Sequence, residues 1–165
     1  MRKCSTSKIR RTVRIVLLNN KSEILLMKVV LPDRTIWCTL GGGIEEDESI
    51  EQAAKRELFE ETGLRDESVL FGPLIWSGEH MLRHEGTLKL HQESFLLLRT
   101  SEQKITTNNM TEEEKSVVKE LKWWSLQELK NSSEFIVPPV LVEKLSELLV
   151  HGAPSSIETI FLGDP

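Results

Sequence analysis

The residues of this sequence with the clearest chemical potential are glutamates crowded into residues 40–64, LGGGIEEDESIEQAAKRELFEETGL. On an α-helix, which turns about 100° per residue, Glu57, Glu60 and Glu61 share a sector about 100° wide. Carboxylates three or four residues apart on a helix repel each other, by about 0.3 kcal/mol per pair in water and by more when partly buried. Three acids held on one face therefore require a counter-charge.

The acidic sector continues an apolar stripe of the same expected helix. Ile50, Ala53 and Ala54 lie on this side one and two turns earlier, which turns the carboxylates inward rather than toward solvent. Rigid carboxylate oxygens are hard ligands that suit Mg²⁺ or Mn²⁺, which also keep waters and bind substrate phosphates. We therefore expect a divalent metal ion as the counter-charge, although an acidic surface helix is the simpler alternative.

Arginine and glycine residues beside the acids fit the same interpretation. Arg56 lies about 100° around the helix from Glu57, where it can hold a neighbouring acid in one rotamer. Gly42 and Gly43 precede the helix and let the backbone approach an ion closely, because glycine has no Cβ. A glycine loop that leads into a carboxylate helix is the outline of a metal and phosphate site.

These residues resemble the Nudix box. Gly42 is followed after five residues by Glu48, and after seven more by RELFEETGL at residues 56–64, so every fixed position of the box is filled. Leu40 departs from the pattern, because many relatives place a proline before the glycines. This difference concerns the rigidity of the loop and no ligand.

The resemblance implies an α/β Nudix fold, a three-layer α/β/α sandwich with a mixed central sheet. It also implies a Mg²⁺- or Mn²⁺-dependent pyrophosphohydrolase that cleaves the diphosphate of a nucleoside diphosphate linked to another moiety. A MutT-like action on a nucleoside triphosphate, oxidised or not, is the leading expectation. The alternatives are hydrolysis of ADP-ribose or another nucleotide sugar, and a Nudix module that binds a nucleotide without cleaving it.

The resemblance assigns roles to individual residues of the box. Glu57, Glu60 and Glu61 are expected to be metal ligands, with the carbonyl of Gly42 as a further ligand. Glu60 and Glu61 are also expected to be catalytic, together with Arg56, which would orient the set.

A general base outside the box is often used in this family. The candidates are Glu93, on an expected strand, and the polar run of Glu112, Glu113 and Glu114, from which we select Glu113. Spacing alone does not rank them, and the simpler alternative for each is a carboxylate that faces solvent.

The elements that must position these residues follow from apolar patterning and turn residues. One helix is expected from Ser49, as N-cap, to Thr62, with Gly63 in the left-handed position after it. Strands are expected at residues 12–18, 23–30, 36–40, 69–77, 87–100 and 121–124. The glycines at 41–43 are expected to end the third strand, and residues 79–86 to connect the fourth and fifth. Further helices are expected at residues 125–130 and 140–150.

Length and composition set limits on the class of protein. The chain has 165 residues, of which 39% are hydrophobic and 28% are charged, so one folded domain is expected. We predict a basic N-terminal lead over residues 1–11, a single Nudix domain over residues 12–151, and a C-terminal tail over residues 152–165 whose docking the sequence leaves open.

Charge and cysteine content limit the partners. A formal net charge of −5 argues against binding to nucleic acid or to an anionic membrane. The two cysteines lack metal-ligand spacing, which favours a reducing compartment, and no apolar run approaches the roughly 18 residues of a membrane span. We predict a cytoplasmic monomer or homodimer that acts on a small-molecule nucleotide.

Overall fold

The computed structural model describes residues 9–84 and 86–163, so most of the basic lead lies outside the described residues. The strands are β1 (Arg10–Leu18), β2 (Ile24–Val30), β3 (Thr35–Gly43), β4 (Val69–His84), β5 (Thr87–Thr100), β6 (Val118–Trp124), β7 (Ile136–Val137) and β8 (Glu158–Thr159). The helices are α1 (Ile50–Thr62), α2 (Glu112–Val117), α3 (Leu126–Asn131) and α4 (Leu141–His151), with a 3₁₀ turn at Asp66–Ser68.

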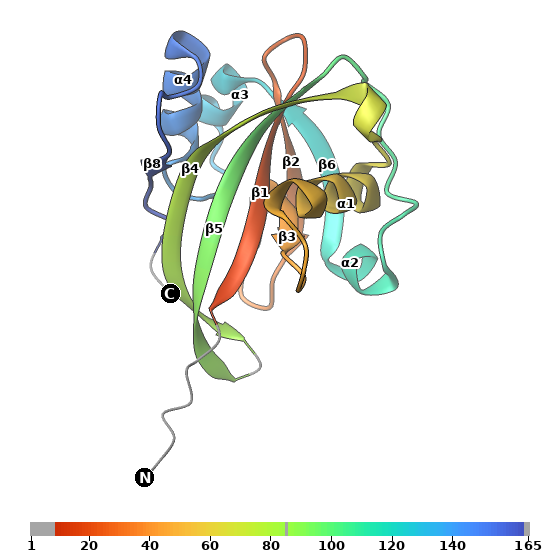
Figure 1. The fold of residues 1–165 in the computed structure, drawn as a ribbon, viewed down its shortest axis with the longest axis vertical. Coiled ribbons are helices and arrows are strands. Elements are labelled where there is room, and N and C mark those ends of the chain that lie inside the picture. The colour runs from red at the N-terminus through yellow and green to blue at the C-terminus, as the bar shows by residue number, and fades with distance from the viewer. Residues whose placement is uncertain (1–8, 85, 164–165) are drawn as a thin grey trace.

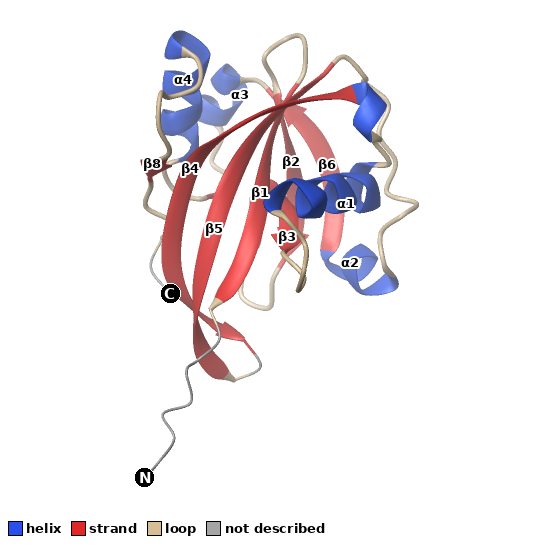
Figure 2. Cartoon of the chain, in the orientation of Figure 1, coloured by secondary structure: helices blue, strands red, loops and turns tan. Residues whose placement is uncertain are grey.

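The strands form one mixed sheet in the order β6-β2-β3-β1-β5-β4-β8, with β7 beside β3. β1 runs parallel to β5 and antiparallel to β2 and β3. Helix α1 crosses one face of the sheet, while α3 and α4 lie behind the other (Figure 1; Figure 2). The predicted three-layer α/β/α sandwich is therefore confirmed.

Two apolar cores, one on each face of the sheet, hold the layers together. Alternate residues of β1 supply both, because successive side chains of a strand point to opposite faces. Ala53, Ala54 and Leu58 of α1 are buried against one face. Leu141, Leu145 and Leu148 of α4 are buried against the other. Each fully buried leucine contributes about 2 kcal/mol through removal of its side chain from water.

Helix α1 begins and ends where the sequence predicts. The side chain of Ser49 accepts a hydrogen bond from the backbone N–H of Gln52, whose side chain in turn accepts one from the N–H of Ser49. Gly63 follows the helix with a φ of 75°, a left-handed conformation that glycine adopts without steric cost. These caps fix where the helix begins and ends, and the helical period then sets the side on which the acidic sector lies.

Two strands, β3 and β4, continue past their predicted C-terminal ends. β3 does not end before the glycines but continues through Gly43, because Gly42 and Gly43 pair with Val13 and Thr12 of β1. β4 continues to His84 and forms a long hairpin with β5, where a connection over residues 79–86 was predicted. The charged and polar residues of this stretch gave no apolar pattern, and its strand structure depends on pairing with β5.

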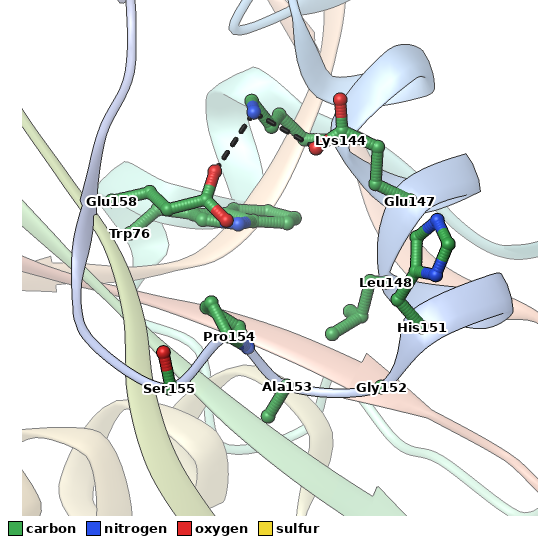
Figure 3. Close-up of a pocket in the computed structure, with 10 residues that line it drawn as sticks. All are labelled: Trp76, Lys144, Glu147, Leu148, His151, Gly152, Ala153, Pro154, Ser155 and Glu158. Atoms are coloured by element: carbon green, nitrogen blue, oxygen red, sulfur yellow. Dashed lines mark hydrogen bonds and ion pairs between the residues drawn. The ribbon is translucent and has the colours of Figure 1, made fainter.

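The C-terminal tail docks on the sheet. Its strand β8 pairs with β4, and Ile160 and Leu162 beyond it are buried. Nζ of Lys144 on α4 lies 2.9 Å from a carboxylate oxygen of Glu147 and 2.8 Å from one of Glu158 (Figure 3). The contact with Glu158 ties the tail to α4 beside a cavity of about 440 Å³, while the contact with Glu147 lies within α4. Over residues 9–84 and 86–163, no helix is long and apolar enough to cross a membrane.

Candidate active site

Two glycines of β3 approach two buried acids of α1. The backbone N–H of Gly41 donates a hydrogen bond of 2.9 Å to Oε2 of Glu61. Gly42 faces the carboxylate of Glu57, and a Cβ added at Gly42 would lie 2.7 Å from the carboxyl carbon. The absence of a side chain is thus what allows the strand and this carboxylate to lie together.

Arg56 joins the acids of the box into one network. Its guanidinium donates hydrogen bonds of 2.8 and 2.9 Å to the two carboxylate oxygens of Glu48, and one of 2.9 Å to the carbonyl of Gly43. It also donates to Glu57 at 2.9 Å and, more weakly, to Glu60 at 3.4 Å. The bond from Arg56 holds the pKa of Glu48 down at about 2. This pair stays ionised at neutral pH and fixes the rotamers of its neighbours.

The carboxylates of Glu57 and Glu61 are in an environment that opposes their charge. They are 8% and 5% exposed, respectively, whereas Glu60 is half-buried. Burial raises the pKa of Glu57, although Arg56 acts against this. Burial and then the charge of Glu57 hold the pKa of Glu61 well above its usual range, with the Gly41 N–H acting in the other direction. Two buried acids this close are stabilised as anions by a further cation.

The structure brings Glu114, rather than Glu113, to these acids. The negative charge of Glu114 contributes to the raised pKa of both Glu57 and Glu61. Among the described residues, Oε2 of Glu114 is buried and has no hydrogen-bond partner. Glu113 is exposed. A signal for this was present in the sequence, because Thr111 is the N-cap of α2 and its side chain accepts from the N–H of Glu114, which sets the phase of the helix.

Glu93, the other candidate base, lies in a second part of the site. It is 6% exposed, and its Oε1 accepts hydrogen bonds of 3.2 and 3.0 Å from Arg14. Nε2 of His80 lies 3.7 Å from the same oxygen. These three side chains line a cavity of about 390 Å³, whose other walls are largely apolar and include Cys38. Arg14 pairs on the sheet with Gly41, whose N–H binds Glu61, so this cavity adjoins the carboxylates.

The donor set fits a divalent metal ion of the magnesium type. Glu57 and Glu61 offer buried carboxylates, Glu114 offers an unpartnered oxygen, and Gly42 leaves no side chain between backbone and acid. Within the described part of the chain, no three His, Cys, Asp or Glu side chains already form a metal cage. Magnesium does not demand one, because it retains waters and takes substrate phosphates as ligands.

We expect Glu114→Gln to lower kcat for the reaction at these carboxylates about 10²-fold and Glu113→Gln to change it less than about threefold. The amide keeps the shape of Glu114 but removes a charge that faces Glu57 and Glu61, whereas Glu113 is exposed to solvent. Steady-state kinetics of the two purified variants, with circular dichroism as a check of folding, measure this difference. An equal loss of kcat in both variants, or a loss in Glu113→Gln alone, would contradict the conclusion that Glu114, rather than Glu113, belongs to the site.

A mixed sheet between two helical layers, with a glycine strand against a carboxylate helix, defines a Nudix domain. Residues 8–143 match the family described as NUDIX domain, and the chain belongs to that family.

Individual relatives match parts of the chain or its fold. The chain is 38% identical over 76 residues to an RNA pyrophosphohydrolase of Pasteurella multocida (strain Pm70), a match that covers 46% of this chain and 36% of the relative. It shares its fold with a NUDIX family hydrolase from Clostridium perfringens, at a TM-score of 0.60 and 21% identity over 87% of this chain and 97% of the other. It also shares its fold with the NUDIX domain of Shewanella oneidensis NrtR, solved with ADP ribose, at a TM-score of 0.60 and 23% identity over 86% and 89% of the two chains.

Proposed function

We propose that this protein is a metal-dependent hydrolase that cleaves a phosphoanhydride bond of a nucleoside triphosphate. The observation that carries the proposal is the pair of buried acids, Glu57 and Glu61, beside the glycines of β3, together with the buried Oε2 atom of Glu114. A structural role alone does not account for it, because burial raises the pKa of Glu57 and Glu61 and so penalises their charged forms. A bound cation and a polyanionic substrate offset that cost.

Each residue of the group has a distinct task in this proposal. Glu57, Glu60 and Glu61, with the carbonyl of Gly42, hold Mg²⁺ or Mn²⁺. Such an ion, when bound, neutralises phosphate charge and lowers the pKa of a coordinated water. Oε2 of Glu114 accepts a proton from the water that attacks phosphorus.

The reaction needs no covalent intermediate on the protein. The oxygen of the attacking water forms a bond to phosphorus, and the bond from that phosphorus to the bridging oxygen breaks. The electron pair of the broken bond stays on the leaving phosphate. Arg56 donates hydrogen bonds to Glu48, Glu57 and Glu60 and so keeps the carboxylates in fixed orientations through the step.

The cavity beside Glu61 is the proposed site for the nucleoside. Its volume of about 390 Å³ lies in the range of small-molecule sites, and apolar walls with a few polar groups suit a planar base. Glu93, which Arg14 holds in place, presents acceptor oxygens to donor groups on the edge of such a base. We therefore assign Glu93 to recognition of the substrate in preference to proton transfer.

A second candidate substrate is the 5′-triphosphate end of an RNA. The curated relatives that match the chain are described as RNA pyrophosphohydrolases, and the match covers 36% of the length of the Pasteurella multocida protein. The bond cleaved is the same kind of phosphoanhydride, so the same acids would serve. The expectation that the protein does not bind nucleic acid rests on the net charge of −5 and remains a prediction.

The test is a panel of substrates incubated with Mg²⁺, with products separated by ion-exchange chromatography. The panel contains the four nucleoside triphosphates, 8-oxo-dGTP, a 5′-triphosphorylated RNA oligonucleotide, ADP-ribose and Ap4A. We expect a nucleoside triphosphate to be cleaved with a kcat/KM at least about tenfold above that for ADP-ribose, and EDTA to abolish the reaction. Preferential cleavage of the RNA would select the second candidate. Binding of nucleotides without any cleavage would leave only a nucleotide-binding module.

A further inference from the structure

A third cavity, of about 480 Å³, opens at the other end of the carboxylates and is rich in positive charge. This cavity, which we term the basic groove, is lined by Arg10, Arg11, Arg56 and Lys89. Two acids, Glu45 and Glu57, are also on its wall. The groove thus gathers four cations against two anions in a chain whose formal net charge is −5.

The parallel pairing of β1 with β5 brings the basic groove together. Arg10 of β1 lies opposite His91 of β5, and Lys89 is two residues before His91. The backbone of Arg11 accepts a hydrogen bond of 2.9 Å from the N–H of Ile44, which places the turn after β3 beside the groove. These residues are far apart in the sequence, so their proximity is a property of the sheet.

The path of β3 sets the order of the three parts of the site. Cys38 and Thr39 line the nucleoside cavity. Gly41 and Gly42 then meet the acids Glu61 and Glu57. Gly43, at the end of the strand, lines the basic groove. The order is therefore nucleoside cavity, carboxylates and basic groove, and Thr39 and Gly43 are separated by about 13 Å of strand.

β1, which runs antiparallel to β3, gives the same order in reverse. Its first two residues, Arg10 and Arg11, line the basic groove, and Arg14 lines the nucleoside cavity. On β5, Lys89 and Glu93 are divided between the two cavities in the same way. All three strands thus place the apolar cavity and the cationic one in a consistent order, and the contacts of β3 place the carboxylates between them.

This order restricts what can extend past the carboxylates. A nucleoside triphosphate with its base in the nucleoside cavity carries its outermost phosphates toward the basic groove. In a nucleotide sugar such as ADP-ribose, an uncharged ribose would occupy that position instead. Arginine and lysine bind phosphate oxygens by charge-assisted hydrogen bonds but gain far less from a neutral sugar.

We propose that Arg10, Arg11 and Lys89 bind the terminal phosphates of the substrate and thereby select a polyphosphate end over a nucleotide sugar. The proposal rests on the proposed function, because it takes the carboxylates as the place where the bond is cleaved. The phosphates released from that end leave through the basic groove.

The first experiment measures binding without turnover. Inorganic tripolyphosphate is titrated by calorimetry into the wild type, Arg10→Ala/Arg11→Ala and Lys89→Ala proteins in Mg²⁺. A double variant at Lys21 and Arg99, both exposed and outside the three cavities, serves as the charge-matched control. We expect Kd to rise at least about tenfold in the groove variants and less than about twofold in the control. An equal rise in groove and control variants would overturn the proposal, since it would show only an effect of net charge.

The second experiment compares two substrates in the same proteins. The groove variants are expected to lower kcat/KM at least about tenfold for a nucleoside triphosphate and less than about threefold for ADP-ribose. Equal losses for both substrates would overturn selection by the groove. If the wild type cleaves neither substrate, the proposed function fails, while the tripolyphosphate titration still decides whether the groove binds phosphates.

Discussion

The Glu61→Gln protein is expected to fold normally and to lose at least about 10³-fold in kcat for nucleotide hydrolysis. Glu61 is 5% exposed and is held in place by the N–H of Gly41. The amide has nearly the same shape and can still accept that hydrogen bond, but it carries no charge for a cation. Steady-state kinetics in saturating Mg²⁺ measure the loss, with the exposed Glu113→Gln variant as the matched control.

The same variant is expected to change the pH dependence of stability when metal is removed by EDTA. The pKa of Glu61 is raised by burial and by Glu57, so the stability linked to its neutral form is fully present below its unfolded pKa, about 4.3. That stability is lost as the pH rises through the folded pKa. The Tm of the metal-free wild type should therefore fall as the pH is raised above about 4.3, and the Tm of Glu61→Gln should fall less.

Thermal melts at a series of pH values, with EDTA or with Mg²⁺, test this account. Mg²⁺ should raise the Tm of the wild type at neutral pH, because a ligand that binds only the folded state stabilises it. It should raise that of Glu61→Gln much less. A variant that keeps wild-type kcat, or that gains as much stability from Mg²⁺ as the wild type, would contradict the role of Glu61 as a metal ligand.

The parts of the site that sequence reasoning found are those encoded locally. The caps Ser49 and Gly63 fix where α1 begins and ends, and the 3.6-residue period then places Glu57 and Glu61 on the inward face. Because all of this information lies within one helix, the pattern alone gave the acidic sector. The adjoining glycines lie next to it in sequence and were found for the same reason.

The parts that it missed depend on contacts between distant segments. Glu114 reaches the acids of α1 only through the packing of α2, more than 50 positions along the chain. The partnership of Arg14 with Glu93 spans 79 positions and follows from the pairing of β1 with β5. The N-cap Thr111 sets which side of α2 carries Glu114, but nothing in the local pattern around Glu114 or Glu93 specifies the distant residue that each one meets.

The glycines of β3 show both what the local sequence predicted and what it did not. The sequence predicted that glycine would allow close approach of the backbone, and Gly42 does lie against Glu57. It did not predict that the glycines continue β3, because a run of glycine ordinarily weakens a strand. Their pairing with β1 holds the strand together. Each glycine therefore has its own fixed neighbours, and substitutions can test the three glycines one at a time.

We expect Gly42→Ala to lower kcat about 10²-fold with only a small change in Tm. A Cβ at Gly42 would lie 2.7 Å from the carboxyl carbon of Glu57, too close for both to keep their positions. The backbone of Gly42 needs no left-handed conformation, and the group that must move is the end of a side chain. The variant should therefore keep its fold while Glu57 leaves the position from which it binds metal.

The two neighbouring glycines separate this effect from general damage to the strand. A Cβ at Gly43 would meet no atom nearer than 3.8 Å, so Gly43→Ala should cost far less activity than Gly42→Ala. Gly41 has a φ of 128°, and a Cβ there would lie 2.9 Å from Cα of Arg14, so Gly41→Ala should lower Tm by several degrees. Kinetics and thermal melts of the three variants test this order. If Gly42→Ala lost Tm in proportion to kcat, the glycine would be required by the fold and not by the position of Glu57.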